Sequence, residues 1–264
     1  MRIALGIEYD GRAFFGWQTQ REEPTVQQTL ERALAVVADH PVSVVCAGRT
    51  DTGVHARCQV AHFDTAAERS ERSWVLGANS NLPASVCVLW ARVVGEDFHA
   101  RFSAVGRRYR YVILNRWIRP ALESGRMSWE RRPLDAEAMH DAAQALVGEH
   151  DFTSFRSSGC KANHPVREVR SVGVQRDGDI VTIDIAANAF LYHMVRNIAG
   201  TLLEVGLGAR EPSWVAEVLA ARDRRLAGVT APPDGLYFMG VRYPDALGLP
   251  DRPPSFPTGE ETRP

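Results

Sequence analysis

The chain has 264 residues, of which 45% are hydrophobic and 24% charged, as is typical of a globular protein with one large domain or two small ones. The formal net charge of −1 gives no indication of a polyanionic partner, and no apolar run is long enough to span a membrane or to serve as a signal peptide. The four cysteines show no C-x-x-C pair, which excludes the common zinc and redox motifs and favours a reduced, cytoplasmic protein.

The first hundred residues predict the element order β-α-β-β-α-β. Apolar alternation marks the strands, and apolar positions at helical spacing mark the helices, the first of which follows the N-cap residue Thr25. The expected elements are strand 2–10, helix 26–37, strand 42–47, strand 60–63, helix 74–80 and strand 86–94. A glycine-flanked aromatic segment at 14–17 follows the first strand, where its rings either stack on bases or pack against the next helix.

The chain up to about residue 245 repeats that order. The expected elements are strand 108–114, helix 135–147, strand 169–175, strand 180–186, helix 189–205, helix 214–222 and strand 236–243. We therefore predict an α+β fold of two tandem ferredoxin-like halves, residues 1–100 and 101–245, fused through a long mixed or antiparallel sheet with a central cleft. Residues 246–264 are rich in proline and lack apolar periodicity, so we expect a disordered tail there.

The stretch Gly48-Arg49-Thr50-Asp51-Thr52-Gly53-Val54-His55-Ala56 follows one of the predicted strands. Two glycines bracket Asp51, and glycine permits the tight backbone that would present a side chain at the end of a strand. A carboxylate held in such a loop can act as a nucleophile or a general base without a cofactor. The alternative is a structural turn, because aspartate and glycine are common turn formers.

This stretch and three motifs further along resemble the tRNA pseudouridine synthase A family. The motifs, in the order the family has them, are G-R-T-D-T-G-V-H-A at 48–56, R-R-Y-R-Y at 107–111, F-L-Y-H-M-V-R-N at 190–197 and A-P-P-D-G-L-Y at 231–237. The resemblance extends over residues 2–243. It implies a homodimeric, cytoplasmic isomerase that needs no cofactor or metal and converts uridines 38, 39 and 40 of the tRNA anticodon stem-loop to pseudouridine.

The resemblance also implies roles for single residues. Asp51 would be catalytic, by attacking the uracil ring, attacking the ribose or removing a ribose proton, and the sequence leaves these three open. Arg196 would pair with Asp51 and lower its pKa, whereas an arginine on a helix is otherwise most often a surface charge. His193 is expected to be a structural hydrogen-bonding residue. Tyr109 would stack on the target uracil, although core packing is the usual role of a strand tyrosine.

Arginines around these motifs are candidates for binding RNA. We expect substrate contacts from Arg49, Arg107, Arg108 and Arg110, with Arg101 close by, although each of them is equally explained as a solvated surface residue. In a strand, Arg108 and Arg110 take the face opposite to Tyr109. Two other functions remain open: a non-catalytic RNA-binding module, and a metal-dependent hydrolase that uses Asp51 and His55. His62 and Asp64 complete a possible metal set, but nothing in their spacing requires one.

Overall fold

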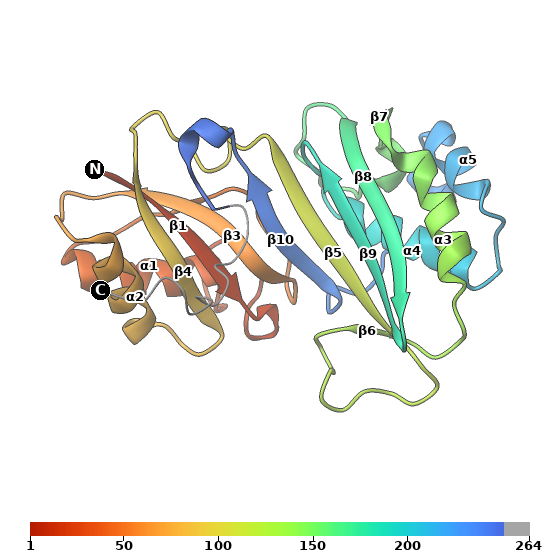
Figure 1. The fold of residues 1–264 in the computed structure, drawn as a ribbon, viewed down its shortest axis with the longest axis horizontal. Helices are drawn as coiled ribbons and strands as arrows, with labels where there is room; N and C mark the ends of the chain where they lie inside the picture. Colours follow the sequence, from red (N-terminus) through yellow and green to blue (C-terminus); the bar gives the residue numbers. More distant parts are fainter. Residues whose placement is uncertain (251–264) are drawn as a thin grey trace, which may run out of the picture.

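The computed structural model describes residues 1–250, which form one mixed ten-stranded sheet with helices packed on it (Figure 1). The strands lie in the order β4-β1-β3-β10-β5-β9-β8-β7, with β2 paired to β3 and β6 paired to β5 off this path. The predicted α+β class and the single long sheet are therefore confirmed.

The first half contains the predicted order of elements. They are β1 (Arg2–Tyr9), α1 (Val26–Ala38), β2 (Val45–Cys46), β3 (His55–Asp64), α2 (Glu71–Asn81) and β4 (Val86–Val94). Thr25 caps α1 as expected, because its side chain accepts a hydrogen bond from the backbone N–H of Gln28. The strand expected at 42–47 was too long, since only Val45 and Cys46 pair with β3. The chain on either side of this short strand is therefore free to turn toward the pocket described below.

The second half contains more elements than expected. They are β5 (Gly106–Asn115), β6 (Ser128–Glu130), α3 (Ala136–Ala143), β7 (Gly148–Asp151), β8 (Val166–Asp177), β9 (Ile180–Ala187), α4 (Met194–Gly206), α5 (Trp214–Ala221) and β10 (Leu236–Arg242). Short 3-10 helices lie at η1 (Gly11–Ala13), η2 (Gln144–Leu146), η3 (Thr153–Phe155), η4 (Arg224–Leu226) and η5 (Asp245–Leu247). The strands β6 and β7 were not predicted, because segments of three and four residues carry too little alternation to be recognised.

The helix expected at 189–205 begins later than predicted, at Met194. The residue before it, His193, has a φ of 60° and a ψ of 8°, which is the left-handed conformation. A right-handed helix cannot pass through such a residue, so residues 189–193 approach α4 as an irregular segment. This correction matters for the site, because that segment lines the pocket instead of lying on a helix surface.

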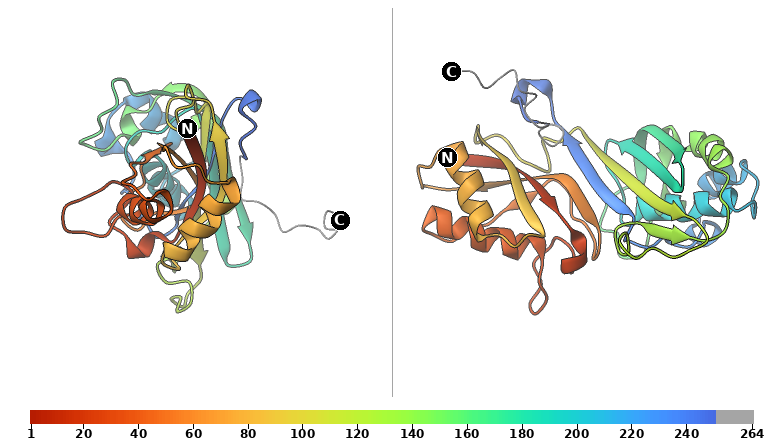
Figure 2. Two further views of the ribbon diagram at one scale, coloured as in Figure 1. Left: turned by 90° about the vertical axis from the view of Figure 1, so that its left-hand side faces the viewer. Right: turned by 60° about the horizontal axis from the view of Figure 1, so that its bottom comes forward.

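The last strand, β10, joins the two halves. It pairs in parallel with the start of β3, where Tyr237 is opposite His55, and antiparallel with β5, where Leu236 is opposite Tyr111. The right-hand view of Figure 2 shows the strand between the two groups of helices. Strand β10, although distant in sequence, therefore lies next to the loop that carries Asp51.

Each half has its own hydrophobic core. The first core packs α1 and α2 on β1, β3 and β4, and its fully buried side chains include Leu30 and Trp74. The second packs α3, α4 and α5 on β5, β8 and β9, with Met139 and Ile198 fully or almost fully buried. Strand β10 contributes to both, because Phe238 belongs to the first core and Leu236 to the second. Truncating a buried phenylalanine such as Phe238 to alanine typically lowers the free energy of unfolding by about 3–5 kcal/mol. Strand β10 therefore also stabilises the connection between the two halves.

The predicted tail at 246–264 falls largely on residues 251–264, which lie outside the described part of the chain. The five residues before them are described, and in these Leu247 and Leu249 pack against the first core. The folded part therefore extends beyond the predicted boundary. In residues 1–250 no helix combines the length and the apolar character that crossing a membrane requires.

Candidate active site

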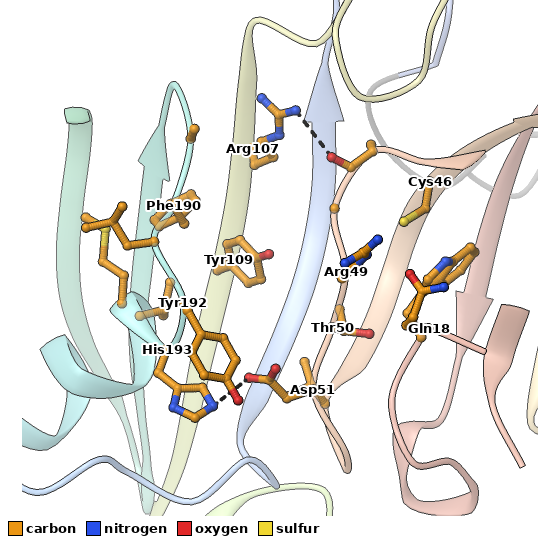
Figure 3. Close-up of a pocket in the computed structure, with 18 of the residues that line it drawn as sticks. Gln18, Cys46, Arg49, Thr50, Asp51, Arg107, Tyr109, Phe190, Tyr192 and His193 are labelled. Carbon is orange, nitrogen blue, oxygen red and sulfur yellow. Dashed lines mark hydrogen bonds and ion pairs between the residues drawn. The ribbon is translucent and has the colours of Figure 1, made fainter. Parts of the chain in front are cut away.

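A cavity of about 560 Å³ lies between the two halves, and the Asp51 loop, the start of β5 and the segment before α4 meet in its wall (Figure 3). The fourth motif contributes Leu236 at the start of β10. The volume is within the roughly 300–1,000 Å³ that is usual for small-molecule sites in proteins. Four motifs that are far apart in sequence thus meet at one place.

Backbone hydrogen bonds hold the Asp51 loop in place. The carbonyl oxygen of Thr50 accepts from the backbone N–H of Trp17 at 3.0 Å, and its hydroxyl oxygen is 2.7 Å from the hydroxyl of Tyr9. The N–H of Val54 donates to the carbonyl oxygen of Asp51 at 3.1 Å, which closes a β-turn whose third residue, Gly53, has a φ of 79°. The backbone that carries the carboxylate is therefore fixed on both sides of Asp51.

The aromatic segment at 14–17 packs against this loop. Phe14 and Trp17 are buried in the first core, so these two rings pack, whereas Phe15 is exposed. Gly16 has a φ of 85°, and a Cβ there would lie 2.8 Å from the carbonyl oxygen of Thr50. Only glycine fits such a close backbone contact with a left-handed conformation, so Gly16 sets the distance between the segment and the loop.

The carboxylate of Asp51 faces two side chains from the third motif. Its Oδ2 atom lies 3.2 Å from Nε2 of His193 and 3.8 Å from Nη1 of Arg196. The exposed fractions of the three side chains are 33% for Asp51, 20% for His193 and 15% for Arg196, so all three are partly buried where they line the cavity. Figure 3 shows the Asp51 and His193 side chains pointing toward one another across the pocket.

Burial is the main influence on the ionisation of this group. It raises the pKa of the Asp51 carboxyl above its ordinary value, and the opposing effects of His193 and Arg196 do not cancel that shift. Arg196 lowers the pKa of Asp51, as expected, but its effect is smaller than that of burial. The reason is geometric: one guanidinium nitrogen at 3.8 Å makes a weaker contact than the bidentate pair that would outweigh burial.

Tyr109 packs edge-on between two phenylalanines. The ring centroid lies 4.9 Å from that of Phe190 and 5.0 Å from that of Phe238, with interplanar angles of 79° and 88°. Burial raises the pKa of Tyr109 well above its ordinary value, so the hydroxyl stays protonated at neutral pH. Within residues 1–250 this hydroxyl has no hydrogen-bond partner, and it is available to a bound molecule in the cavity.

The predicted arginines separate into two sets. Arg49, Arg101 and Arg107 line the cavity. Arg107 also has a structural role, because its guanidinium donates to the carbonyl oxygens of Arg101 at 2.7 Å and of Asn188 at 2.9 Å and so connects these two segments. Arg108 and Arg110 do not line the cavity, and their place on the opposite face of β5 agrees with the alternation of the strand.

Arg110 has a partner of its own on that opposite face. Its Nε and Nη2 atoms donate to the two carboxylate oxygens of Asp184 on β9, at 2.8 and 2.9 Å. Both side chains are 43% exposed, so this is a surface ion pair. The expected contact between Arg110 and a substrate bound beside Tyr109 is not supported by this arrangement, and the same holds for Arg108.

His193 is the site residue whose role the sequence did not reveal. It was expected to make a structural hydrogen bond, and it also contacts Asp51 directly. The one signal in the sequence is its spacing, three residues before Arg196, which would place both side chains near one face of a helix. Ser157, which contacts the other ring nitrogen of His193 at 3.2 Å, has no signal in the sequence because it lies in an irregular segment.

The possible metal set is separated in the structure. Nδ1 of His55 accepts from the backbone N–H of Gly11 at 3.1 Å, and Nε2 lies 3.0 Å from the carbonyl oxygen of Gly125, so both ring nitrogens have protein partners. Asp64 is paired with Arg2 through its two oxygens. In the part of the chain that the structure describes, no three histidine, cysteine or acidic side chains cluster as metal ligands would.

The cavity is strongly positive. Asp51 is the single carboxylate among the described lining residues, which also include the cations Arg49, Arg101, Arg107, Lys161, Arg167 and Arg196. Apart from Arg196, none of these cations forms an ion pair with a carboxylate in residues 1–250. Unpaired cations around a cavity attract anions, so the site is suited to a phosphate-bearing ligand with one carboxylate left for chemistry.

Comparison with known proteins agrees with these motifs. A family model described as tRNA pseudouridine synthase matches residues 6–103 and 142–244. A protein of Xylella fastidiosa named tRNA pseudouridine synthase A is 58% identical over 251 residues, covering 95% of this chain and 98% of the relative. Proteins of the same name from Methylococcus capsulatus and Coxiella burnetii are 59% and 55% identical; they cover 94% and 96% of this chain and 92% and 97% of the relatives.

Proposed function

The chain belongs to the tRNA pseudouridine synthase family and is an isomerase, and on that premise we propose that Asp51 is its catalytic residue and uridines 38, 39 and 40 of the tRNA anticodon stem-loop are its targets. The observation that supports the assignment of Asp51 is its position as the lone carboxylate that residues 1–250 contribute to a cavity lined by cations. The positions in the tRNA are inferred from the family resemblance.

The reaction rearranges bonds within one nucleotide. The glycosidic bond between C1′ and N1 breaks, the uracil turns, a bond forms between C1′ and C5, the hydrogen at C5 leaves as a proton, and N1 takes up a proton. Asp51 assists by attack on the ring, attack on the ribose or removal of a ribose proton. Each of these roles requires an ionised carboxylate, and the contacts with His193 and Arg196 favour the ionised form against the effect of burial.

The target base has to leave its stack to reach Asp51. Extruding a nucleotide from a stem costs a few kcal/mol, which binding of the remaining RNA has to offset. The cations of the cavity wall supply phosphate contacts for this purpose, and Tyr109 offers an aromatic ring beside the carboxylate. This arrangement favours a catalyst over a simple RNA-binding module, because a module needs no buried carboxylate in its binding surface.

Release of tritium from tRNA labelled at C5 of uridine tests the proposal. We expect Asp51→Asn to lower this release by about three orders of magnitude or more, with tRNA binding preserved, because asparagine keeps the shape but loses the charge. Asp51→Glu should be nearly as inactive, since an added methylene displaces the carboxylate. Asp184→Asn is the matched control, because Asp184 lies outside the cavity and pairs with Arg110.

Turnover by Asp51→Asn, purified from a host without its own enzyme, would refute the assignment. Binding of tRNA without any tritium release by the wild-type protein would instead support the RNA-binding module. The homodimeric state is a separate prediction from the family resemblance, and light scattering of the purified protein tests it.

A further inference from the structure

A chain of hydrogen bonds leads from Arg224 to the ring of His193. It starts at the guanidinium of Arg224, which can only donate, and Nη2 donates to Oδ1 of Asn197 at 3.0 Å. The hydroxyl of Thr230 donates to the same oxygen at 2.6 Å. The Nδ2 group of Asn197 donates in turn to the carbonyl oxygen of Phe155 at 2.8 Å. A flipped Asn197 amide would place donor against donor and acceptor against acceptor, so its orientation is fixed by its neighbours.

The series of hydrogen bonds continues from Asn197 to Ser157. The second Nδ2 hydrogen of Asn197 points to Oγ of Ser157 at 3.2 Å, so this oxygen is an acceptor there. The hydroxyl hydrogen of Ser157 remains available to Nδ1 of His193, also at 3.2 Å. A ring nitrogen that accepts a hydrogen bond carries no proton. Nε2 lies 3.2 Å from Oδ2 of Asp51, and an ionised carboxylate can only accept, so the proton of a neutral His193 ring is on Nε2.

We propose that His193 is a positioning residue, held by Ser157 and Asn197 as the neutral tautomer whose Nε2–H donates to Oδ2 of Asp51. This inference rests on the proposed catalytic role of Asp51. A donor on Oδ2 orients the carboxylate and leaves Oδ1 for the substrate. Because the ring is neutral, it holds the carboxylate without the full positive charge that would further reduce its basicity.

The surroundings of His193 favour the neutral ring. The side chain is largely buried, and the cations Arg196 on α4 and Arg224 on η4 disfavour a second positive charge beside them. These effects lower the pKa of His193 below its ordinary value, and the charge of Asp51 opposes them. On its open side the ring stacks on Tyr192, with centroids 3.8 Å apart, which limits rotation of the imidazole.

The left-handed backbone of His193 also depends on the segment that contains Ser157. A non-glycine residue with a φ of 60° costs on the order of 1 kcal/mol and persists where the surroundings determine it. Here the backbone N–H of Ser157 donates to the carbonyl oxygen of Tyr192 at 3.2 Å, so the two segments are connected by backbone as well as by side chains. Both the position and the tautomer of the ring thus depend on the segment that contains Ser157.

Nitrogen NMR of the full chain labelled with ¹⁵N-histidine tests the tautomer without any assay of activity. The signals of His193 are assigned by their loss in His193→Gln. At neutral pH we expect a protonated Nε2 and an unprotonated Nδ1. Ser157→Ala should remove this preference and give a mixture of tautomers. Ser158→Ala, the exposed neighbour, is the matched control and should leave the signals unchanged.

Kinetics then tests whether the tautomer serves the reaction. We expect Ser157→Ala to lower kcat for tritium release by roughly three- to tenfold, with KM for tRNA little changed. His193→Leu should lower kcat by about tenfold to a hundredfold, because a hydrogen bond to a charged group is lost. His193→Gln should restore part of that loss, since its amide N–H can replace Nε2–H. The melting temperature of each variant shows whether it is folded.

The outcomes separate this inference from the proposed function. A proton on Nδ1, or a doubly protonated ring at neutral pH, would overturn the inference whatever Asp51 does. Unchanged tautomer and turnover in Ser157→Ala would also overturn it. An active Asp51→Asn enzyme would instead overturn the catalytic role of Asp51, while the NMR result for His193 would still stand.

Discussion

The Nε hydrogen of Arg196 is donated to the carbonyl oxygen of Ala231, at 2.7 Å. The backbone N–H of Ala231 donates back to the carbonyl oxygen of Arg196 at 3.1 Å, so the two residues are held together twice. With Nε occupied, the guanidinium faces Asp51 through its Nη1 atom. Arg196 therefore connects the residue that precedes Pro232 in the fourth motif to the carboxylate of the first.

Arg196→Lys should be strongly impaired although the charge is kept. A single ammonium group cannot bond Ala231 and approach Asp51 at the same time, because it lacks the planar fork of the guanidinium. We expect kcat for tritium release to fall by about a hundredfold, which corresponds to the loss of a charge-assisted hydrogen bond at the site. A folded Arg196→Lys enzyme with near-native kcat would show that the guanidinium geometry is unimportant.

Tyr109→Phe should keep the ring between Phe190 and Phe238 but lose the hydroxyl. We expect tRNA affinity to change little and kcat to fall by about a hundredfold, the low end of what proton-transfer groups contribute. Tyr109→Ala should lose the ring as well and weaken tRNA binding, because base stacking is worth about 1–3 kcal/mol. If the phenylalanine and alanine variants both had wild-type kcat and affinity, Tyr109 would have no part in the site.

Arg49→Ala and Arg110→Ala form a pair that tests which face binds RNA. Arg49 is exposed in the cavity wall without an ion-pair partner in residues 1–250, whereas Arg110 is paired with Asp184. We expect Arg49→Ala to weaken tRNA binding and to reduce the slope of log K against log salt by about one. Arg110→Ala should leave both quantities and the stability nearly unchanged, since exposed ion pairs contribute about 0–1 kcal/mol. The reverse result would place the RNA on the other face of β5.

Asp51→Asn should stabilise the protein against unfolding at neutral pH. Since burial raises the folded-state pKa of Asp51, the folded protein binds the proton more tightly than the unfolded chain does. The free energy of unfolding therefore decreases as pH rises from the ordinary carboxyl pKa of about 3.9 through the raised value. Asparagine does not titrate, so the variant should melt at a higher temperature at pH 7 and lose this advantage in acid. Calorimetry at several pH values measures this difference, and identical curves for both proteins would contradict it.

The sequence predicts helices and strands well where the pattern of apolar residues extends over many positions. The strand expected at 86–94 coincides with β4, and the strands expected at 169–175 and 180–186 lie within β8 and β9, which pair as a hairpin. In both cases alternation continues for several residues and a turn sequence or proline marks the end. Among the site residues, the alternation of β5 correctly separates Tyr109 from Arg108 and Arg110.

The remaining features depend on contacts between distant segments. No local pattern marks the left-handed backbone of His193, because the surrounding residues Phe190 to Met194 are as apolar as a helix interior. The pKa of Asp51 depends on burial in a cavity that both halves have to form. Ser157 reaches His193 through the fold alone, from a segment with no periodicity.

The position of β10 sets a condition on when the enzyme becomes active during its synthesis. Both β3, which follows the Asp51 loop, and β5, which carries Tyr109, are made long before the strand that separates them. Until residues 236–242 have left the ribosome, the two walls of the cavity have no common neighbour in the sheet. Pairing of such distant segments is slow compared with local folding. We therefore expect a chain that stops before residue 236 to lack the assembled cavity and the activity that depends on it.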